Sequence, residues 1–177
     1  DFLKNRRDPK KPFVLYLAHT KMHTIIDASD KFRGKSAGGL YGDVVETIDR
    51  SMGVLLDTLQ ELNIDDNTLI IFTSDNGPWF EGSSGQYRDR KGSSWEGGLR
   101  VPFIARWPGQ IPAGSYTSEP AMNIDLLPTL LDYAGVDLPA DRPIDGRSIK
   151  GVLTSQESSP HEVLYLFNRD RIAGVRV

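Results

Sequence analysis

The sequence predicts an α/β fold, a sandwich in which helices cover a predominantly parallel β-sheet. Three observations predict it: an almost wholly apolar run at Phe13–Ala18, a helical periodicity from Leu40 to Leu62, and a β-favouring run at Asn67–Ser74. Short, fully apolar runs are typical of strands buried on both faces, as in parallel sheets. A helix between two such strands indicates a crossover connection. Since we find no internal repeat or low-complexity linker, residues 1–177 are interpreted as one domain.

The helix is predicted from apolar residues that recur at spacings of three and four. These residues are Tyr41, Val44, Val45, Ile48, Met52, Leu55, Leu56, Leu59 and Leu62. Asn63 is expected to end the helix because Asn tolerates the left-handed backbone conformation. The short link that follows leads directly into the strand at Asn67–Ser74.

The segment from Gly77 to Gly98 is rich in Gly and Ser and has no periodicity. Loops of this length in a compact domain are usually functional or disordered. The next strand is predicted at Val101–Trp107, with its first residues at a sheet edge because of Pro102, and a Pro108–Gly109 turn closes it.

The last third of the chain predicts one helix and two short strands. Asp125–Tyr133 reads as a helix with Asp125 as its N-cap and Pro128 in its first turn, where proline is tolerated. Gly135 is its expected stop. The two strands are expected at residues 162–167 and 172–177.

Composition excludes several classes of function. The net charge of -3 and the scattered basic residues provide no face for nucleic acid. No apolar run approaches the roughly 18 residues of a membrane span. The chain has no cysteine, which excludes disulfides, thiolate ligands and thiol nucleophiles. A start without Met and an end within the strand-like "RIAGVRV" indicate a fragment.

Polar side chains follow the two apolar runs, at the edge where parallel sheets bind ligands. His19 and His23 follow the first run, and Asp75 and Asn76 follow the second. The adjacent oxygens of Asp75 and Asn76 suit a hard cation such as Ca²⁺ or Mg²⁺. The alternative is that Asp-Asn-Gly only makes a turn, as these residues often do.

Lys91 and the two histidines are further candidates. Lys91 lies in "RDRKGSSWEGG", among small residues whose backbone N–H groups suit an anion, but it equally fits a solvated loop lysine. A pair of histidines on a loop is weak evidence for a site, because such residues are often structural. From the residues alone, the sequence indicates a hard-metal and anion site and leaves the reaction open.

Four stretches, in order, resemble the second half of the catalytic domain of arylsulfatase-type sulfatases. They are "PFVLYLAHTKMH", "GLYGDVVETIDRSMGVLLDTLQELNIDDNTLIIFTSDNG", "RKGSSWEGGLRVPFIARWPGQIPAG" and "NIDLLPTLLDYAGVDLP" with a later "DG". The resemblance runs from about residue 12 to residue 177. It implies a three-layer sandwich of the alkaline phosphatase-like superfamily, present here as a partial domain.

The resemblance also implies roles for individual residues. Asp75 and Asn76 match the family's ligands for a divalent cation, usually calcium, and Lys91 matches a lysine that contacts the substrate sulfate. His23 matches a sulfate-binding histidine, although Met22 and Ile25 stand where prolines are usual. His19 is given at most a supporting role.

The family's nucleophile is absent from this sequence. Sulfatases use a formylglycine made from Cys or Ser in a C/S-x-P/A-S-R motif, and no such motif occurs here. The resemblance therefore implies an upstream half of the catalytic domain, without which the chain would be inactive. It also implies a small-molecule or glycan sulfate ester as substrate and a periplasmic, secreted or lysosomal location. Two alternatives stay open: a phosphodiesterase or phosphonate hydrolase of the same superfamily, and a non-catalytic sulfatase-like domain.

Overall fold

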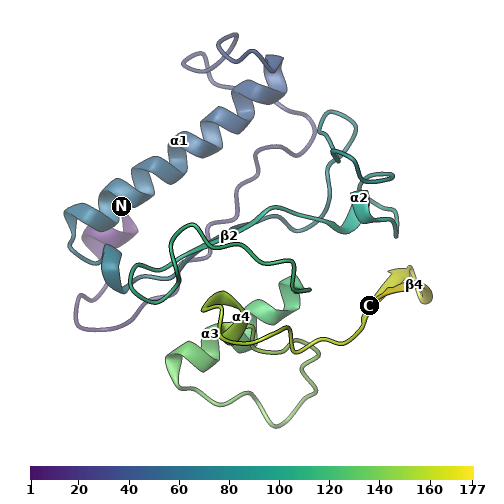
Figure 1. Cartoon of the computed structure of the whole chain (residues 1–177). Coiled ribbons are helices and arrows are strands. Elements are labelled where there is room, and N and C mark those ends of the chain that lie inside the picture. Colours follow the sequence, from purple (N-terminus) through teal and green to yellow (C-terminus); the bar gives the residue numbers. More distant parts are fainter. The chain divides into compact units, whose positions relative to one another are not determined.

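The computed structural model describes residues 1–177, and its internal contacts divide the chain into two compact units (Figure 1). The first unit comprises Asp1–Thr68 and Trp79–Ser83, and the second comprises Leu69–Pro78 and Ser84–Val177. No helix in either unit combines the length and the apolar character that crossing a membrane requires.

The first unit is built on the long helix α1, Gly39–Glu61, which confirms the predicted helix. Its buried apolar residues are Val44, Ile48 and Leu59. Asn63 adopts a left-handed conformation with φ of 54°, as expected for the residue that ends the helix. The π-helical turn η1, Phe2–Arg6, and the 3-10 turn η2, Asp65–Asn67, both contact α1.

A buried carboxylate fixes the chain before α1. Asp43 is almost fully buried and accepts hydrogen bonds from the backbone N–H groups of Gly34 at 2.7 Å, Lys35 at 3.0 Å and Ser36 at 2.8 Å. These bonds, that from Ser36 foremost, hold the pKa of the Asp43 carboxyl below its ordinary value of 3.8. Asp43 therefore ties the loop at residues 34–36 to the helix.

The stability of the first unit is expected to depend on this carboxylate. When folding lowers the pKa of a carboxyl group, its ionised form stabilises the fold. This stabilisation is fully present above the pKa of the unfolded chain and is lost as the pH falls through the pKa of the folded protein. At neutral pH, the Asp43→Asn variant should therefore unfold at a lower urea concentration than the unsubstituted protein. When the pH falls below the ordinary pKa of 3.8, the variant should lose less stability than the unsubstituted protein does. Urea midpoints measured across that range check this. Exposed Asp49→Asn is the control, and equal pH profiles for the two variants would contradict the role of Asp43.

The expected strand at Phe13–Ala18 is not formed, so this prediction is wrong for the structure. The segment is in no sheet, and its apolar side chains from Val14 onward are exposed, with Val14 77% and Tyr16 90% accessible. A strand buried on both faces needs a neighbour on each side, and the sheets of this structure contain β1 to β4 alone. The predicted strand–helix–strand crossover is absent for the same reason.

The second unit contains two antiparallel pairs of strands, so the expected parallel sheet is not present. Strand β1, Ile70–Thr73, pairs with β2, Phe103–Arg106, in the register Ile70 to Arg106 and Thr73 to Phe103. Both lie inside the predicted runs, and Pro102 precedes β2, consistent with the exclusion of proline from ladder positions. The chain reverses through the long loop between them and returns beside β1 (Figure 1), which makes the pairing antiparallel.

The remaining elements include the predicted helix and C-terminal strands, together with two short helices that the sequence did not predict. The short helix α2 spans Glu96–Leu99, the 3-10 turn η3 spans Asn123–Asp125, and α3 spans Leu126–Ala134. Gly135 ends α3 with φ of 66°, as predicted. Helix α4 spans Lys150–Leu153. Strands β3, Leu164–Asn168, and β4, Arg171–Arg176, form the C-terminal hairpin and confirm the two predicted short strands.

Candidate functional site

Asp75 and Asn76 lie directly after β1, and their side chains contact each other. Asn76 Nδ2 donates to Asp75 Oδ2 at 2.5 Å, while the Ser74 hydroxyl lies 3.4 Å from Asp75 Oδ1. Asp75 is exposed. The strand therefore ends in an accessible carboxylate with a carboxamide beside it.

These two residues fit a hard cation as part of its ligand set. A carboxylate and a carboxamide oxygen from adjacent positions are the donors that Ca²⁺ and Mg²⁺ prefer. No group of three or more His, Cys, Asp or Glu side chains in residues 1–177 is placed to hold a metal ion. Because Ca²⁺ takes about six to eight oxygen ligands, Asp75 and Asn76 would be a partial set.

The backbone directly after Asn76 is hydrogen-bonded to later residues of the long loop between β1 and β2. Gly77 N donates to Gly98 O at 2.9 Å, and Lys91 N donates to Pro78 O at 2.9 Å. Gly97 N donates to Arg88 O at 2.9 Å, which closes residues 88–97, Lys91 among them, into a backbone ring. The backbone of Lys91 is therefore bonded to a residue two positions after Asn76, and both segments belong to the same unit.

The glycines of the loop are required by this close packing. A Cβ atom on Gly77 would lie 2.2 Å from the carbonyl oxygen of Gly97, and one on Gly97 would lie 2.1 Å from that of Asp89. Both obstacles are backbone atoms, which cannot rotate away as a flexible side chain can. The "DNG" and "EGG" motifs are therefore explained by the crossing of two backbone segments.

Gly97→Ala is accordingly expected to lower the free energy of unfolding by about 1–3 kcal/mol, the usual effect of overpacking. The matched control is Gly53→Ala, in the middle of α1, where a Cβ meets no atom within 4 Å. That variant is expected to gain roughly 1 kcal/mol because Ala is the better helix former. Urea unfolding of both variants tests the pair, and a stable Gly97→Ala variant would show that the loop is not packed as described.

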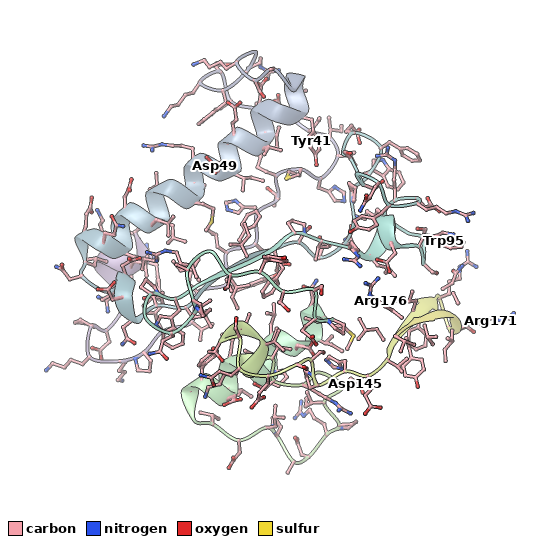
Figure 2. The ribbon with its side chains drawn as sticks, in the orientation of Figure 1. Tyr41, Asp49, Trp95, Asp145, Arg171 and Arg176 are labelled. Atoms are coloured by element: carbon pink, nitrogen blue, oxygen red, sulfur yellow. The ribbon has the colours of Figure 1, made fainter.

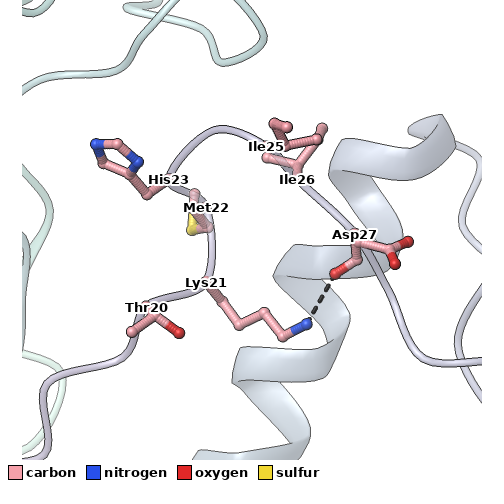
Figure 3. Close-up of a pocket in the computed structure, with 7 residues that line it drawn as sticks. All are labelled: Thr20, Lys21, Met22, His23, Ile25, Ile26 and Asp27. Atoms are coloured by element: carbon pink, nitrogen blue, oxygen red, sulfur yellow. Dashed lines mark hydrogen bonds between the residues drawn. The ribbon is translucent and has the colours of Figure 1, made fainter.

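His19 and His23 lie in the first unit, on the segment that was expected to follow a strand. His23 lines a shallow hollow of about 130 Å³ at residues 20–27 (Figure 3). Its Nδ1 donates to Thr24 O at 2.8 Å, which leaves Nε2 as the basic nitrogen of the neutral ring. In the same hollow, Lys21 Nζ donates to Asp27 O at 2.8 Å (Figure 3).

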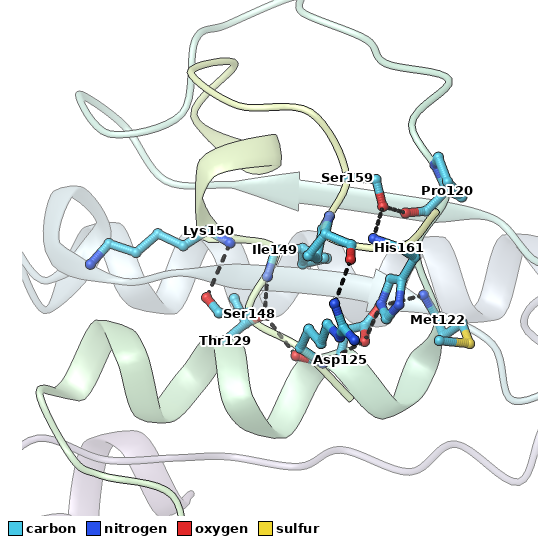
Figure 4. Close-up of polar contacts among 11 residues, drawn as sticks. Pro120, Met122, Asp125, Thr129, Ser148, Ile149, Lys150, Ser159 and His161 are labelled. Atoms are coloured by element: carbon cyan, nitrogen blue, oxygen red, sulfur yellow. Dashed lines mark hydrogen bonds and ion pairs between the residues drawn. The ribbon is translucent and has the colours of Figure 1, made fainter. Parts of the chain in front are cut away.

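A buried polar cluster around Asp125, which the sequence did not predict, is linked to the end of β1. Asp125 lies at the N-cap position of α3, as predicted, but its carboxylate accepts from Met122 N at 2.7 Å, Arg147 N at 2.9 Å and His161 Nε2 at 2.9 Å (Figure 4). Asp125 is fully buried. The cluster fixes η3, where Asn123 Nδ2 donates to Ser74 O at 2.9 Å. It therefore supports the residue that precedes Asp75.

The family model described as Sulfatase matches residues 1–136. The chain belongs to the sulfatase family. The curated relatives of this sulfatase chain include the steryl-sulfatase of Rattus norvegicus, 43% identical over 93% of the chain, and the arylsulfatase of Hemicentrotus pulcherrimus, 40% identical over 94%. The chain spans 30% and 31% of the lengths of these two relatives.

Solved structures show the same likeness. The crystal structure of Ps i-CgsB in complex with k-i-k-neocarrahexaose matches with a TM-score of 0.78 and 35% identity, covering 84% of this chain and 35% of that protein. The structure of BT4656 in complex with its substrate, D-Glucosamine-2-N, 6-O-disulfate, matches with a TM-score of 0.60 and 32% identity. The match covers 82% of this chain and 32% of BT4656. The sulfatase chain is thus a small α/β structure that matches about a third of larger sulfatase folds.

Proposed function

We propose that the parent protein of this chain hydrolyses sulfate esters and that the chain supplies the second half of its catalytic domain. The observation that supports this most is the backbone bond between Lys91 and Pro78, because it ties the "KGSSWEGG" loop to the chain two positions after Asn76. A cationic side chain next to two hard oxygen ligands is the arrangement that a metal-assisted reaction of an anionic ester requires.

Asp75 and Asn76 would hold a divalent cation, calcium by family resemblance, with magnesium as the alternative. When bound, that cation supplies positive charge to the sulfate oxygens. Lys91 would bind the sulfate as a point charge and hold the sulfur in line for attack. His23 would contact the sulfate through Nε2 and, when the ring is also protonated at Nε2, donate that proton to the leaving oxygen of the ester. The nucleophile would be a formylglycine on the upstream half of the domain.

The exposed apolar run at residues 14–17 supports the reading of a partial domain. Its side chains are of the kind that a central strand buries, and here they face solvent. We propose that this run is a strand of the complete domain, and that residues 1–177 form part of that one domain.

A sulfated small molecule or glycan is the proposed substrate. The relatives named above include a steryl-sulfatase, and the similar structures include complexes with a neocarrahexaose and with a disulfated glucosamine. Trp79, Phe80 and Tyr87 precede Lys91 and would stack on the ring that carries the sulfate.

Hydrolysis assays of the full-length parent protein test the proposal. We expect turnover of 4-nitrophenyl sulfate with added Ca²⁺ and much slower turnover of bis(4-nitrophenyl) phosphate. Preference for the phosphate ester would favour the phosphodiesterase alternative. Absence of turnover with a modified upstream nucleophile would favour a non-catalytic domain.

A further inference from the structure

The loop around Lys91 is attached to the C-terminal hairpin by two side chains. Ser94 Oγ donates to Phe167 O on β3 at 3.1 Å, and Arg176 Nη1 on β4 donates to Glu96 Oε1 at 2.9 Å. Residues 94 and 96 thus contact one strand each. They lie three and five positions after Lys91, within the backbone ring of residues 88–97.

Glu96 is shared between the hairpin and its own helix. Its second oxygen, Oε2, pairs with Arg100 Nε one turn later in the chain. Arg100, and then Arg176, lower the pKa of the Glu96 carboxyl, so it stays ionised at neutral pH. The side chains are about one-third to two-fifths exposed, 32% for Glu96 and 40% for Arg176. A carboxylate clamped between two guanidinium groups has less freedom than one in a single exposed ion pair.

Most contacts of the hairpin are between its own two strands, β3 and β4. The contacts through Phe167 and Arg176 therefore join this two-stranded hairpin to the loop. On the loop side, the guanidinium of Arg88 stacks 3.9 Å from the Trp95 ring centre, between the two attached positions. Figure 2 shows Trp95 beside α2, and Arg171 and Arg176 at the two ends of β4.

We infer that the β3–β4 hairpin is a positioning element for Lys91, acting through Glu96 and Ser94. The inference rests on the proposed function, because it concerns how Lys91 meets the sulfate. A flexible lysine on a Gly/Ser-rich loop loses conformational entropy when it binds an anion. Attachment of the loop at residues 94 and 96 removes part of that cost before binding. Arg176 is then a positioning residue and has no contact with the substrate.

The test measures inhibition by inorganic sulfate, KM for 4-nitrophenyl sulfate and thermal midpoint in the full-length parent protein. Arg176→Met is expected to weaken sulfate inhibition and raise KM by about 2- to 5-fold, the range of an exposed ion pair. Arg176→Lys should retain most of the affinity because it keeps the charge. Arg171→Met, at the other end of β4, is the matched control and should change neither value.

The decisive readout is the effect of Arg176→Met in a Lys91→Ala background. If the hairpin acts through Lys91, the loss in sulfate affinity disappears there, since coupled residues are not additive. An equal loss in both backgrounds, or no loss from Arg176→Met in the parent, overturns the inference. If Lys91→Ala alone leaves sulfate inhibition unchanged, the proposed function fails instead, so the two failures are distinguishable.

Discussion

The Asp75→Ala variant of the full-length parent is expected to lose both its bound divalent cation and sulfate-ester turnover. Asp75 is the carboxylate of the strand-end pair, and its oxygens are exposed and held beside Asn76. Removing the charged ligand leaves only a neutral carboxamide at this position, which binds a hard cation far more weakly. Because the cation stabilises charge on the reacting group, we expect turnover to fall by about 100-fold or more.

Metal analysis of the purified variant, together with 4-nitrophenyl sulfate assays at rising Ca²⁺, measures both losses. Asp49→Ala is the control, because Asp49 is an exposed carboxylate on α1 (Figure 2). Unchanged metal content in Asp75→Ala would show that Asp75-Asn76-Gly77 makes a turn and no more. Partial rescue by high Ca²⁺ would support the ligand role, since a weakened site fills at higher concentration.

Lys91→Ala is expected to reduce kcat/KM by roughly 10²- to 10³-fold, the range for loss of one charge-stabilising group. The backbone of Lys91 is fixed by its bond to Pro78, so the substitution removes the ammonium group without changing the path of the loop. Lys91→Arg should retain part of the activity because it keeps the charge but changes the geometry of the head group.

Steady-state kinetics and inhibition by inorganic sulfate separate binding from turnover in these variants. A loss confined to KM would indicate that Lys91 binds substrate and transition state equally, and a fall in kcat would indicate stronger contact in the transition state. Lys10→Ala is the control, because Lys10 is an exposed lysine in the other unit. Wild-type kinetics for Lys91→Ala would exclude it from the site.

Local features of the fold could be predicted because their causes lie within a few residues. The spacing of apolar residues gave α1, Asn63 and Gly135 supplied the left-handed helix ends, and Pro102 lies just outside β2. In each case the conformational preference of one residue type decided the boundary. These predictions did not depend on distant parts of the chain.

The sheet could not be predicted in the same way. Whether an apolar run is buried depends on which strands pair beside it, and that is a non-local property. Phe13–Ala18 has the composition of a central strand and was the expected parallel partner of β1, but it is in no sheet, and β1 pairs with β2 antiparallel. The strand at Ile70–Thr73 was therefore predicted correctly, and what was wrong was the strand expected to pair with it.

The buried hydrogen bonds of Asp125 also could not be predicted from the sequence. The Asp125 carboxylate binds His161 across 36 positions and Arg147 N across 22. A Ser, Thr, Asp or Asn before a helix predicts a local cap, and nothing local indicates such distant donors. For the candidate site, residue types indicated Asp75, Asn76 and Lys91, but only the structure explains the nearby glycines by backbone crossing.

A crystal structure of the full-length parent grown with Ca²⁺ and sulfate tests the central claim most directly. We predict a cation bonded to the side-chain oxygens of both Asp75 and Asn76, and a sulfate within hydrogen-bond distance of Lys91 Nζ. A cation bound at other residues, with Asn76 still donating to Asp75, would contradict the claim.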